Sequence, residues 1–410
     1  MSPTVLALLT LSVAPPQDGG LLASEWRFVL ESPGGELPFR LNFARDEERT
    51  IAWIQNGEER IPSGPLEREG DHWLLNLEPY DSRLVFRVSD GGALISGHWE
   101  KSLGGERQAR LPLRGTKGRK SRFPLVAVDS EQRSRLAGRW AVRFSGDEDL
   151  AIGTFACNAD GTATGTFETT LGDYRFLAGV FDGERLRLSC FDGGHAFLFD
   201  ARLRADGSLE GDFWSRDSWH ETWAATKDPD AELPDPFGLT TWIDAVPLSE
   251  LRFPDLLGKP RSLADEAFSG RARIITLFGT WCPNCNDEAT FLRALHERYG
   301  KRGLSILGLA FELDDDFERS VRQVERFRER HALPYPVLIA GVADKKEASR
   351  AFPALDRVRA YPTAILLDGD GKVRAIHTGF SGPATGPAHE HQRERYELLL
   401  EELLAEGRSK

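Results

Sequence analysis

Hydrophobic and polar residues alternate with a period of two over the first half of the chain, from Trp26 to about Trp223. Residues 39–43 and 140–144 are clear examples, with a hydrophobic residue at every second position. Such alternation is typical of strands that bury one face and expose the other. Asn-Gly and Asp-Gly pairs such as Asn56-Gly57 stand between these runs and supply the positive φ angles of tight hairpins. We therefore predict an all-β, antiparallel domain over residues 22–227.

This β-rich domain contains a faint internal repeat. Residues 90–99 resemble residues 206–214, because both segments begin with Asp-Gly and end in Trp. We expect two halves, over about 22–115 and 123–227, joined by a basic, solvated connector. Two half-barrels, two sandwiches or one large barrel all fit this pattern.

The pattern changes after residue 227. Residues 228–246 are predicted to be a linker, since residues 228–236 carry three prolines among acidic residues. Beyond them, short apolar runs alternate with segments of helical hydrophobic spacing. Strands are expected at residues 273–278, 304–311, 335–339, 363–367 and 372–377, and helices at about 289–299, 317–331 and 396–404. This order predicts an α/β layered domain over residues 247–410.

Composition and charge narrow the class of protein. With 410 residues, 40% of them hydrophobic and 28% charged, a chain of two or three folded domains is expected. A net charge of −12 argues against a nucleic-acid partner, which would need a surplus of Lys and Arg. Residues 1–20 are a candidate signal segment, although no Lys or Arg precedes its apolar run. We therefore expect export and no transmembrane segment, since the apolar run is too short to span a bilayer.

The most specific chemical signal is Cys282-Pro283-Asn284-Cys285, which stands between the first strand and the first helix of the α/β domain. This position places Cys282 at a helix N-terminus, where unpaired amides and the helix dipole stabilise a thiolate. A zinc site would need four ligands, and no second pair of Cys or His with ligand spacing follows in this domain. We predict a redox-active disulfide and neither a metal nor another cofactor.

The segment from Phe278 to Cys285 resembles the active-site segment of the thioredoxin superfamily. Residues 253–260, 361–363 and 368–372 are similar to the TlpA/ResA branch of envelope reductases, and the likeness covers about residues 247–405. It implies a thioredoxin-like domain that reduces protein disulfides in the bacterial periplasm or cell envelope. In that branch the substrates are often apocytochrome c or misbonded proteins, and a membrane electron donor of the DsbD/CcdA kind recharges the pair. The β-rich domain lies outside the resemblance.

The resemblance also assigns roles to individual residues. Cys282 matches the attacking cysteine and Cys285 the resolving cysteine. Pro362 matches the cis-proline loop, with a simple turn proline as the alternative. A cis peptide there leaves the backbone of Tyr361 free to pair with an extended substrate, so Tyr361 and Trp281 are expected at the substrate-binding surface.

Two further positions bear on the redox chemistry. Glu312 resembles an acidic residue that tunes the cysteines in this branch, with an ordinary exposed carboxylate as the alternative. Thr276 stands where thioredoxins proper hold a buried Asp, which removes that proton-transfer route. Pro-Asn also replaces Gly-Pro between the cysteines. The direction of electron flow is therefore open: a reductase is expected from the family, and an isomerase or oxidase remains an alternative.

Other classes of protein fit less well. A peroxiredoxin needs Pro and Thr at two fixed offsets before its cysteine, and these positions hold Ile275 and Gly279. The cysteines are also too close together for a copper-delivery protein of the Sco kind, although His377 could serve as a distal ligand. A non-enzymatic alternative is an envelope binding protein whose β-rich domain recognises a partner. Cys157 and Cys190 both point to the buried face by strand alternation, and we expect free thiols rather than a structural disulfide.

Overall fold

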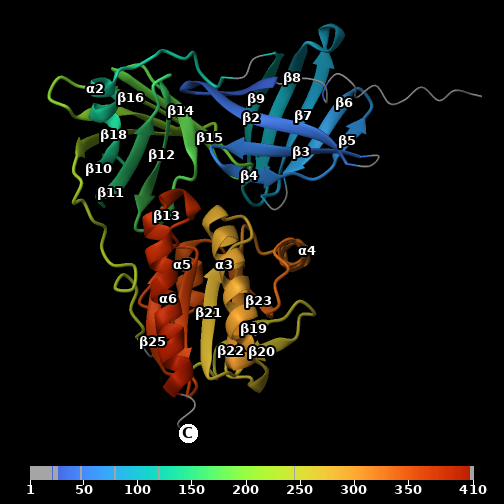
Figure 1. Cartoon of the computed structure of the whole chain (residues 1–410). Helices are drawn as coiled ribbons and strands as arrows, with labels where there is room; N and C mark the ends of the chain where they lie inside the picture. The colour runs from blue at the N-terminus through green and yellow to red at the C-terminus, as the bar shows by residue number, and fades with distance from the viewer. Residues whose placement is uncertain are drawn as a thin grey trace, which may run out of the picture.

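The computed structural model describes residues 21, 26–46, 49–77, 80–118, 121–243 and 245–406. The candidate signal segment, residues 1–20, lies outside the described residues. The first half of the chain forms two antiparallel β units, as predicted, and the second half forms a mixed α/β domain (Figure 1).

The first β unit is a nine-stranded sheet in the order β4-β3-β2-β1-β9-β8-β7-β6-β5. Its strands are β1 (Trp26–Ser32), β2 (Gly35–Asp46), β3 (Arg49–Asn56), β4 (Glu59–Pro62), β5 (Leu66–Glu69), β6 (His72–Leu77), β7 (Ser82–Ser89), β8 (Leu94–Ser102) and β9 (Gln108–Lys117). A short 3-10 turn, η1 (Asp90–Gly92), joins β7 to β8. Alternate side chains fill its core, among them Phe28, Phe86 and Trp99, each fully buried.

The second β unit begins with helix α2 (Ser130–Leu136), which is capped by Asp129 and Gln132. Its strands are β10 (Gly138–Phe144), β11 (Ala151–Cys157), β12 (Thr162–Thr169), β13 (Gly172–Asp173), β14 (Leu177–Phe181), β15 (Arg185–Phe191), β16 (Ala196–Leu203), β17 (Leu209–Ser215) and β18 (Trp219–Lys227). Pairing of β11 with β12 closes eight of these strands into a barrel, and β13 extends β12 outside the ring. Trp140, Phe167 and Phe199 are buried inside.

The two units have matching strand orders. In the first, β1 lies between β2 and β9, followed by β8 and β7; in the second, β10 lies between β11 and β18, followed by β17 and β16. The repeated sequence segments lead into the equivalent strands β8 and β17, which agrees with the duplication suggested by the sequence. The units differ in closure, because among the described strands the two ends of the sheet pair in the second unit and not in the first.

The α/β domain is built on a five-stranded sheet in the order β23-β22-β21-β24-β25. Its strands are β21 (Ala272–Phe278), β22 (Leu304–Glu312), β23 (Val337–Val342), β24 (Thr363–Asp368) and β25 (Val373–Thr378), preceded by a β19 (Arg252–Pro254)–β20 (Pro260–Ser262) hairpin. Its helices are α3 (Pro283–Tyr299), α4 (Phe317–Arg330), α5 (Lys345–Ala351) and α6 (Pro387–Glu406), with 3-10 turns η2 (Glu266–Phe268), η3 (Gly300–Arg302) and η4 (Pro383–Thr385). The five expected sheet strands are present, each beginning within two residues of its predicted start. No helix in the described ranges is long and apolar enough to cross a membrane.

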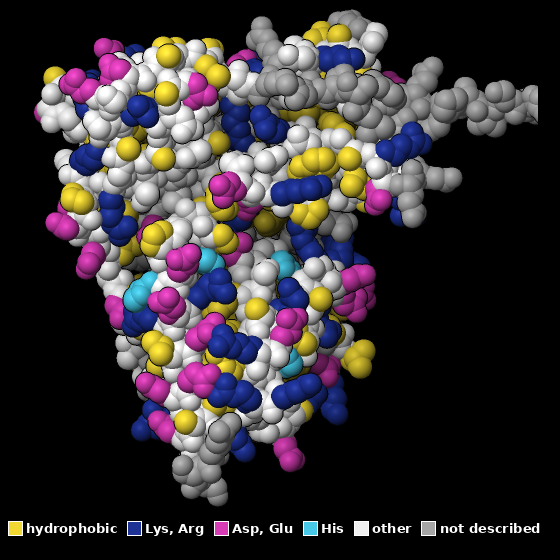
Figure 2. Space-filling model, in the orientation of Figure 1, with side chains coloured by type: hydrophobic (Ala, Val, Ile, Leu, Met, Phe, Trp, Pro, Cys, Tyr) yellow, Lys and Arg dark blue, Asp and Glu magenta, His cyan; other side chains and the backbone are white. Residues whose placement is uncertain are grey.

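The described part of the predicted linker runs along the α/β domain. Phe237 and Trp242 pack against its core, and Arg395 of α6 binds Asp235 with both guanidinium nitrogens, at 2.8 and 3.0 Å. In Figure 1 the two β units lie side by side above this domain, at the end that carries the start of α3. Charged side chains of both signs are interspersed over the face of the α/β domain drawn in Figure 2.

Candidate redox site

Cys282 is the N-cap residue of α3, and Pro283 occupies the first helical position. The sequence dictates this arrangement because proline lacks the N–H that would be unpaired there and fixes a helical φ angle. The backbone N–H of Cys285 donates to Cys282 Sγ at 3.4 Å. The sulfur thus receives one of the free amides at the helix start, as the sequence predicted.

The loop before β24 lies beside this sulfur. The peptide bond between Tyr361 and Pro362 is cis, as expected from the sequence. The Cys282 thiol donates to the carbonyl oxygen of Tyr361 at 3.4 Å. Trp281 packs edge-on against the Tyr361 ring with 5.8 Å between ring centroids, and its indole N–H donates to the Phe311 carbonyl at 2.9 Å. The predicted substrate-binding pair and the predicted attacking cysteine are therefore neighbours.

Cys285 lies deeper than Cys282, at 1% against 6% exposure. Burial, reinforced by the neighbouring Cys282, raises the pKa of the Cys285 thiol well above its usual value. A thiol that keeps its proton is a poor first nucleophile. This difference in environment favours Cys282 for the first attack and Cys285 for the second.

A buried carboxylate that sequence reasoning missed lies near Cys285. Glu288 is 1% exposed, and the hydroxyl of Thr276 donates to its Oε2 at 2.6 Å. Burial raises the pKa of Glu288 to about 8, and its charge acts on Cys285. The strand carries no carboxyl group at Thr276, as the sequence shows, but α3 supplies one against it, Glu288.

Glu312 ends β22 and is only 4% exposed, so the alternative of an ordinary exposed carboxylate is wrong. Its carboxylate accepts the backbone N–H of Thr280 at 3.0 Å and the Thr280 hydroxyl at 2.7 Å. Burial raises the pKa of Glu312 to about 7. The two hydrogen bonds from Thr280 to Glu312 fix the loop that leads into Cys282.

The β units cover the two cysteines. Gly194, in the β15–β16 loop, approaches so closely that a Cβ built on it would lie 3.3 Å from Cγ of Pro283. Asn284, between the cysteines, donates to Asp173 Oδ2 of β13 at 3.0 Å, and Asp173 also accepts the backbone N–H of Gly382 at 2.5 Å. This contact places the β-rich region over the start of α3, beside Cys282.

Arg175 links three parts of the molecule at this contact. Its side chain is 5% exposed and forms ion pairs with Glu59 of β4 and Asp287 of α3, and its Nε lies 3.6 Å from Asp192 Oδ2. Burial raises the pKa of Glu59 to about 7 although the Arg175 charge opposes the shift. Since buried carboxylates need a cation to stay ionised, Arg175 holds the contact together.

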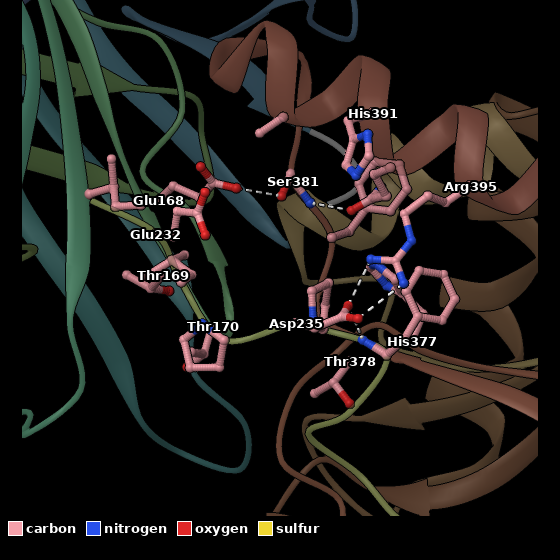
Figure 3. Close-up of a pocket in the computed structure, with 18 of the residues that line it drawn as sticks. Glu168, Thr169, Thr170, Glu232, Asp235, His377, Thr378, Ser381, His391 and Arg395 are labelled. Atoms are coloured by element: carbon pink, nitrogen blue, oxygen red, sulfur yellow. Dashed lines mark hydrogen bonds and ion pairs between the residues drawn. The ribbon is translucent and has the colours of Figure 1, made fainter. Parts of the chain in front are cut away.

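A separate cavity of about 460 Å³ lies between the barrel, the linker and the α/β domain (Figure 3). Ser381 donates across it to Glu168 of β12 at 2.9 Å. His377 lines this cavity, whereas Cys282 and Cys285 do not, and burial lowers the pKa of His377 to about 4. In the described residues no group of three or more His, Cys, Asp or Glu side chains is arranged to hold a metal ion.

Cys157 and Cys190 are both free thiols, as expected. Cys190 is fully buried in the barrel wall. Cys157 is half-exposed rather than buried as predicted, because β11 ends at this residue and the chain turns away.

A C-x-x-C pair at the start of a helix, beside a cis-proline loop on a mixed five-stranded sheet, is the arrangement of a thioredoxin-like redox domain. A model of the AhpC/TSA family matches residues 244–376, so the α/β domain is similar to that family. Ile275 and Gly279 still occupy the offsets that a peroxidase motif would fill with Pro and Thr.

Two curated relatives resemble the same domain. The chain is 30% identical over 125 residues to the thiol-disulfide oxidoreductase ResA of Geobacillus thermodenitrificans, covering 30% of this chain and 63% of that protein. It is 30% identical over 124 residues to the thioredoxin-like protein YneN of Bacillus subtilis, covering 30% and 65%. The chain thus spans less than two thirds of the length of either relative. A solved thiol:disulfide interchange protein from Chlorobium tepidum TLS is 24% identical, with 39% of this chain and 99% of that chain covered and a TM-score of 0.29.

Proposed function

We propose that this protein is a thiol–disulfide oxidoreductase that reduces protein disulfides in the bacterial envelope. The observation that carries the proposal is the setting of Cys282 Sγ, which accepts an N–H at the start of α3 and lies against the Tyr361 carbonyl. The name thiol-disulfide oxidoreductase borne by a relative supports the reaction type. The envelope location rests on the candidate signal segment and on the resemblance to envelope reductases.

The reaction proceeds by two exchanges. The Cys282 thiolate attacks one sulfur of the substrate disulfide, forms a mixed disulfide and releases the other substrate sulfur as a thiolate that takes up a proton. Cys285 then loses its proton, attacks the Cys282 sulfur and expels the second substrate thiolate. Two electrons pass to the substrate, and Cys282 and Cys285 are left as a disulfide. A membrane donor of the DsbD/CcdA kind would return the electrons.

Glu288 is placed to receive the proton of Cys285. Its pKa of about 8 lies near neutrality, where a general base exchanges protons readily. Substrate must also reach a sulfur that is 6% exposed, so the β units have to move away from α3 during each cycle. Trp281 and the backbone of Tyr361 would then receive the extended substrate.

Trapping of the mixed disulfide tests this proposal. Wild-type protein should catalyse the reduction of insulin by dithiothreitol, and Cys285→Ser should accumulate a covalent adduct with a disulfide substrate. Cys282→Ser should form no such adduct, and Cys190→Ser, which alters a buried cysteine of the barrel, should behave as wild type. Equal trapping by both active-site variants would contradict the assigned roles.

The cover over the cysteines also favours a second candidate function. A binding protein whose β-rich domain recognises an envelope partner, with the thioredoxin-like domain as support, has no need of exposed sulfurs. A pair that can be oxidised and reduced but turns over no disulfide substrate would favour this function. Rearrangement of scrambled disulfides without net reduction would instead indicate an isomerase.

A further inference from the structure

Lys101 is a buried cation of the first β unit that lies close to the redox pair. It stands on β8 and is 7% exposed. Its ammonium donates to the carbonyl of Gly194 at 2.7 Å and lies 5.9 Å from the centre of the Tyr80 ring. In the described part of the chain that carbonyl is its one hydrogen-bond partner, and no carboxylate forms an ion pair with it. A buried ammonium in this situation lacks a matching anion.

The Gly194 carbonyl connects Lys101 with the start of α3. Gly194 packs between Tyr80 and Pro283, since a Cβ built on it would lie 3.0 Å from the Tyr80 ring and 3.3 Å from Cγ of Pro283. Pro283 follows Cys282 directly. Burial lowers the pKa of Lys101 to about 8, and Cys282 is among the groups whose negative charge counteracts that shift.

The carboxylates around Lys101 already have other cations. Asp192, whose charge acts most strongly on Lys101, lies 3.1 Å from His195 Nδ1 and 3.6 Å from Arg175 Nε. Asp81 forms an ion pair with Arg319 of α4. Arg216 also acts on Lys101 and is itself a cation. A thiolate at Cys282 is therefore the anion left for Lys101 to balance.

We propose that Lys101 is a positioning residue for the redox reaction, supplied by the β-rich region, whose ammonium stabilises the Cys282 thiolate. This inference rests on the proposed function, because it takes Cys282 as the attacking sulfur. A cation that stabilises the thiolate favours the reduced form of the pair, so the β-rich region makes the pair a stronger oxidant than the thioredoxin-like domain would be alone. Lys101 thus gives the β-rich region a chemical role in addition to covering the site.

The test compares full-length variants of two lysines. Lys101→Met removes the charge at similar volume, and Lys101→Arg keeps the charge. Lys117→Met, at the exposed end of β9, is the matched control. We measure the equilibrium of the Cys282/Cys285 pair with glutathione, which gives the reduction potential of the pair in the full-length protein.

Lys101→Met should shift the exchange equilibrium about tenfold towards the disulfide, a potential about 30 mV more negative. Lys101→Arg should keep most of the wild-type values, and Lys117→Met all of them. If Lys101→Met fails to fold, Lys101→Gln, which can still donate to the Gly194 carbonyl, takes its place.

Failure of this inference and failure of the proposed function give different results. If wild-type protein reduces disulfides but the neutral variants of Lys101 keep its potential, Lys101 does not act on Cys282. If wild-type protein turns over no disulfide at all, the proposed function is refuted, independently of the results with the lysine variants.

Discussion

Replacement of Arg175 by methionine is expected to uncover the redox pair. Methionine retains much of the side chain but leaves Glu59, Asp287 and Asp192 without the cation that lies among them. Removal of one partner of a buried ion pair destabilises by about 3–5 kcal/mol. These carboxylates belong to the first β unit, the thioredoxin-like domain and the barrel, so separation of the units relieves the strain by returning them to water. A loss of about 3 kcal/mol at the contact increases the separated population about a hundredfold.

Alkylation of reduced, full-length protein measures this population, because Cys282 reacts when the cover is open. Both proteins react from the separated state, so the observed rate should rise with the population of that state, by at least about tenfold. The control is Arg185→Met in the same barrel, where the guanidinium binds Asp200 but is 41% exposed. Such a pair contributes about 0–1 kcal/mol, and the alkylation rate should change less than about fivefold. An Arg175→Met protein that folds and is alkylated at the wild-type rate would refute the reasoning.

Three further outcomes are expected. Asn284→Ala removes two hydrogen bonds of 3.0 Å, to Asp173 and to the Phe380 carbonyl, and should speed alkylation by less than Arg175→Met because each bond contributes about 1 kcal/mol. Burial raises the folded-state pKa of Glu288 from 4.5 to about 8, so its contribution to stability is complete below about pH 4.5 and is lost as the pH rises through about 8. Glu288→Gln should abolish that loss, which is at most about 5 kcal/mol; urea unfolding at about pH 5 and about pH 9 measures it, and equal pH dependence in both proteins would contradict it. Thiol titration in denaturant should find all four cysteines reactive in reduced protein and two, Cys157 and Cys190, after mild oxidation, whereas none would indicate a second disulfide.

The sequence predicted the thioredoxin-like domain more closely than the β-rich region because buried strands and helices leave local signals. The apolar run of β22, for example, lies between two helical periodicities and was placed within one residue at its end. Alternation likewise located the strands of the β units. Their closure depends on pairing of β11 with β12, a contact between neighbouring strands that the same alternation would allow in an open sheet.

The residues of the redox site also differ in how far the sequence predicts them. Cys282, Cys285 and Pro362 belong to fixed motifs, so the sequence alone identifies them as site residues. Glu288 had a signal, since it follows Cys285 by three residues and shares its helical face, but a charged residue in a helix is ordinarily assigned to solvent. Lys101 and Arg175 reach the site only when the β units dock on α3, and no local pattern encodes that contact.

Cys282 and Cys285 are 6% and 1% exposed. Their burial limits the access of oxidants to the two thiols. If the protein reduces disulfides as proposed, a substrate would have to displace or engage the β units first. The Arg175→Met variant tests this requirement, because Arg175 lies between carboxylates of the three units.

The reduction potential of Cys282 and Cys285 in the full-length protein is the most direct test of the redox assignment. A reversible two-electron couple well below about −200 mV is expected for a protein that delivers electrons to disulfides. A couple near the potential of strong periplasmic oxidants, about −120 mV, would reverse the direction of electron flow. Absence of any couple that requires both cysteines would contradict the assignment of this site to thiol–disulfide exchange.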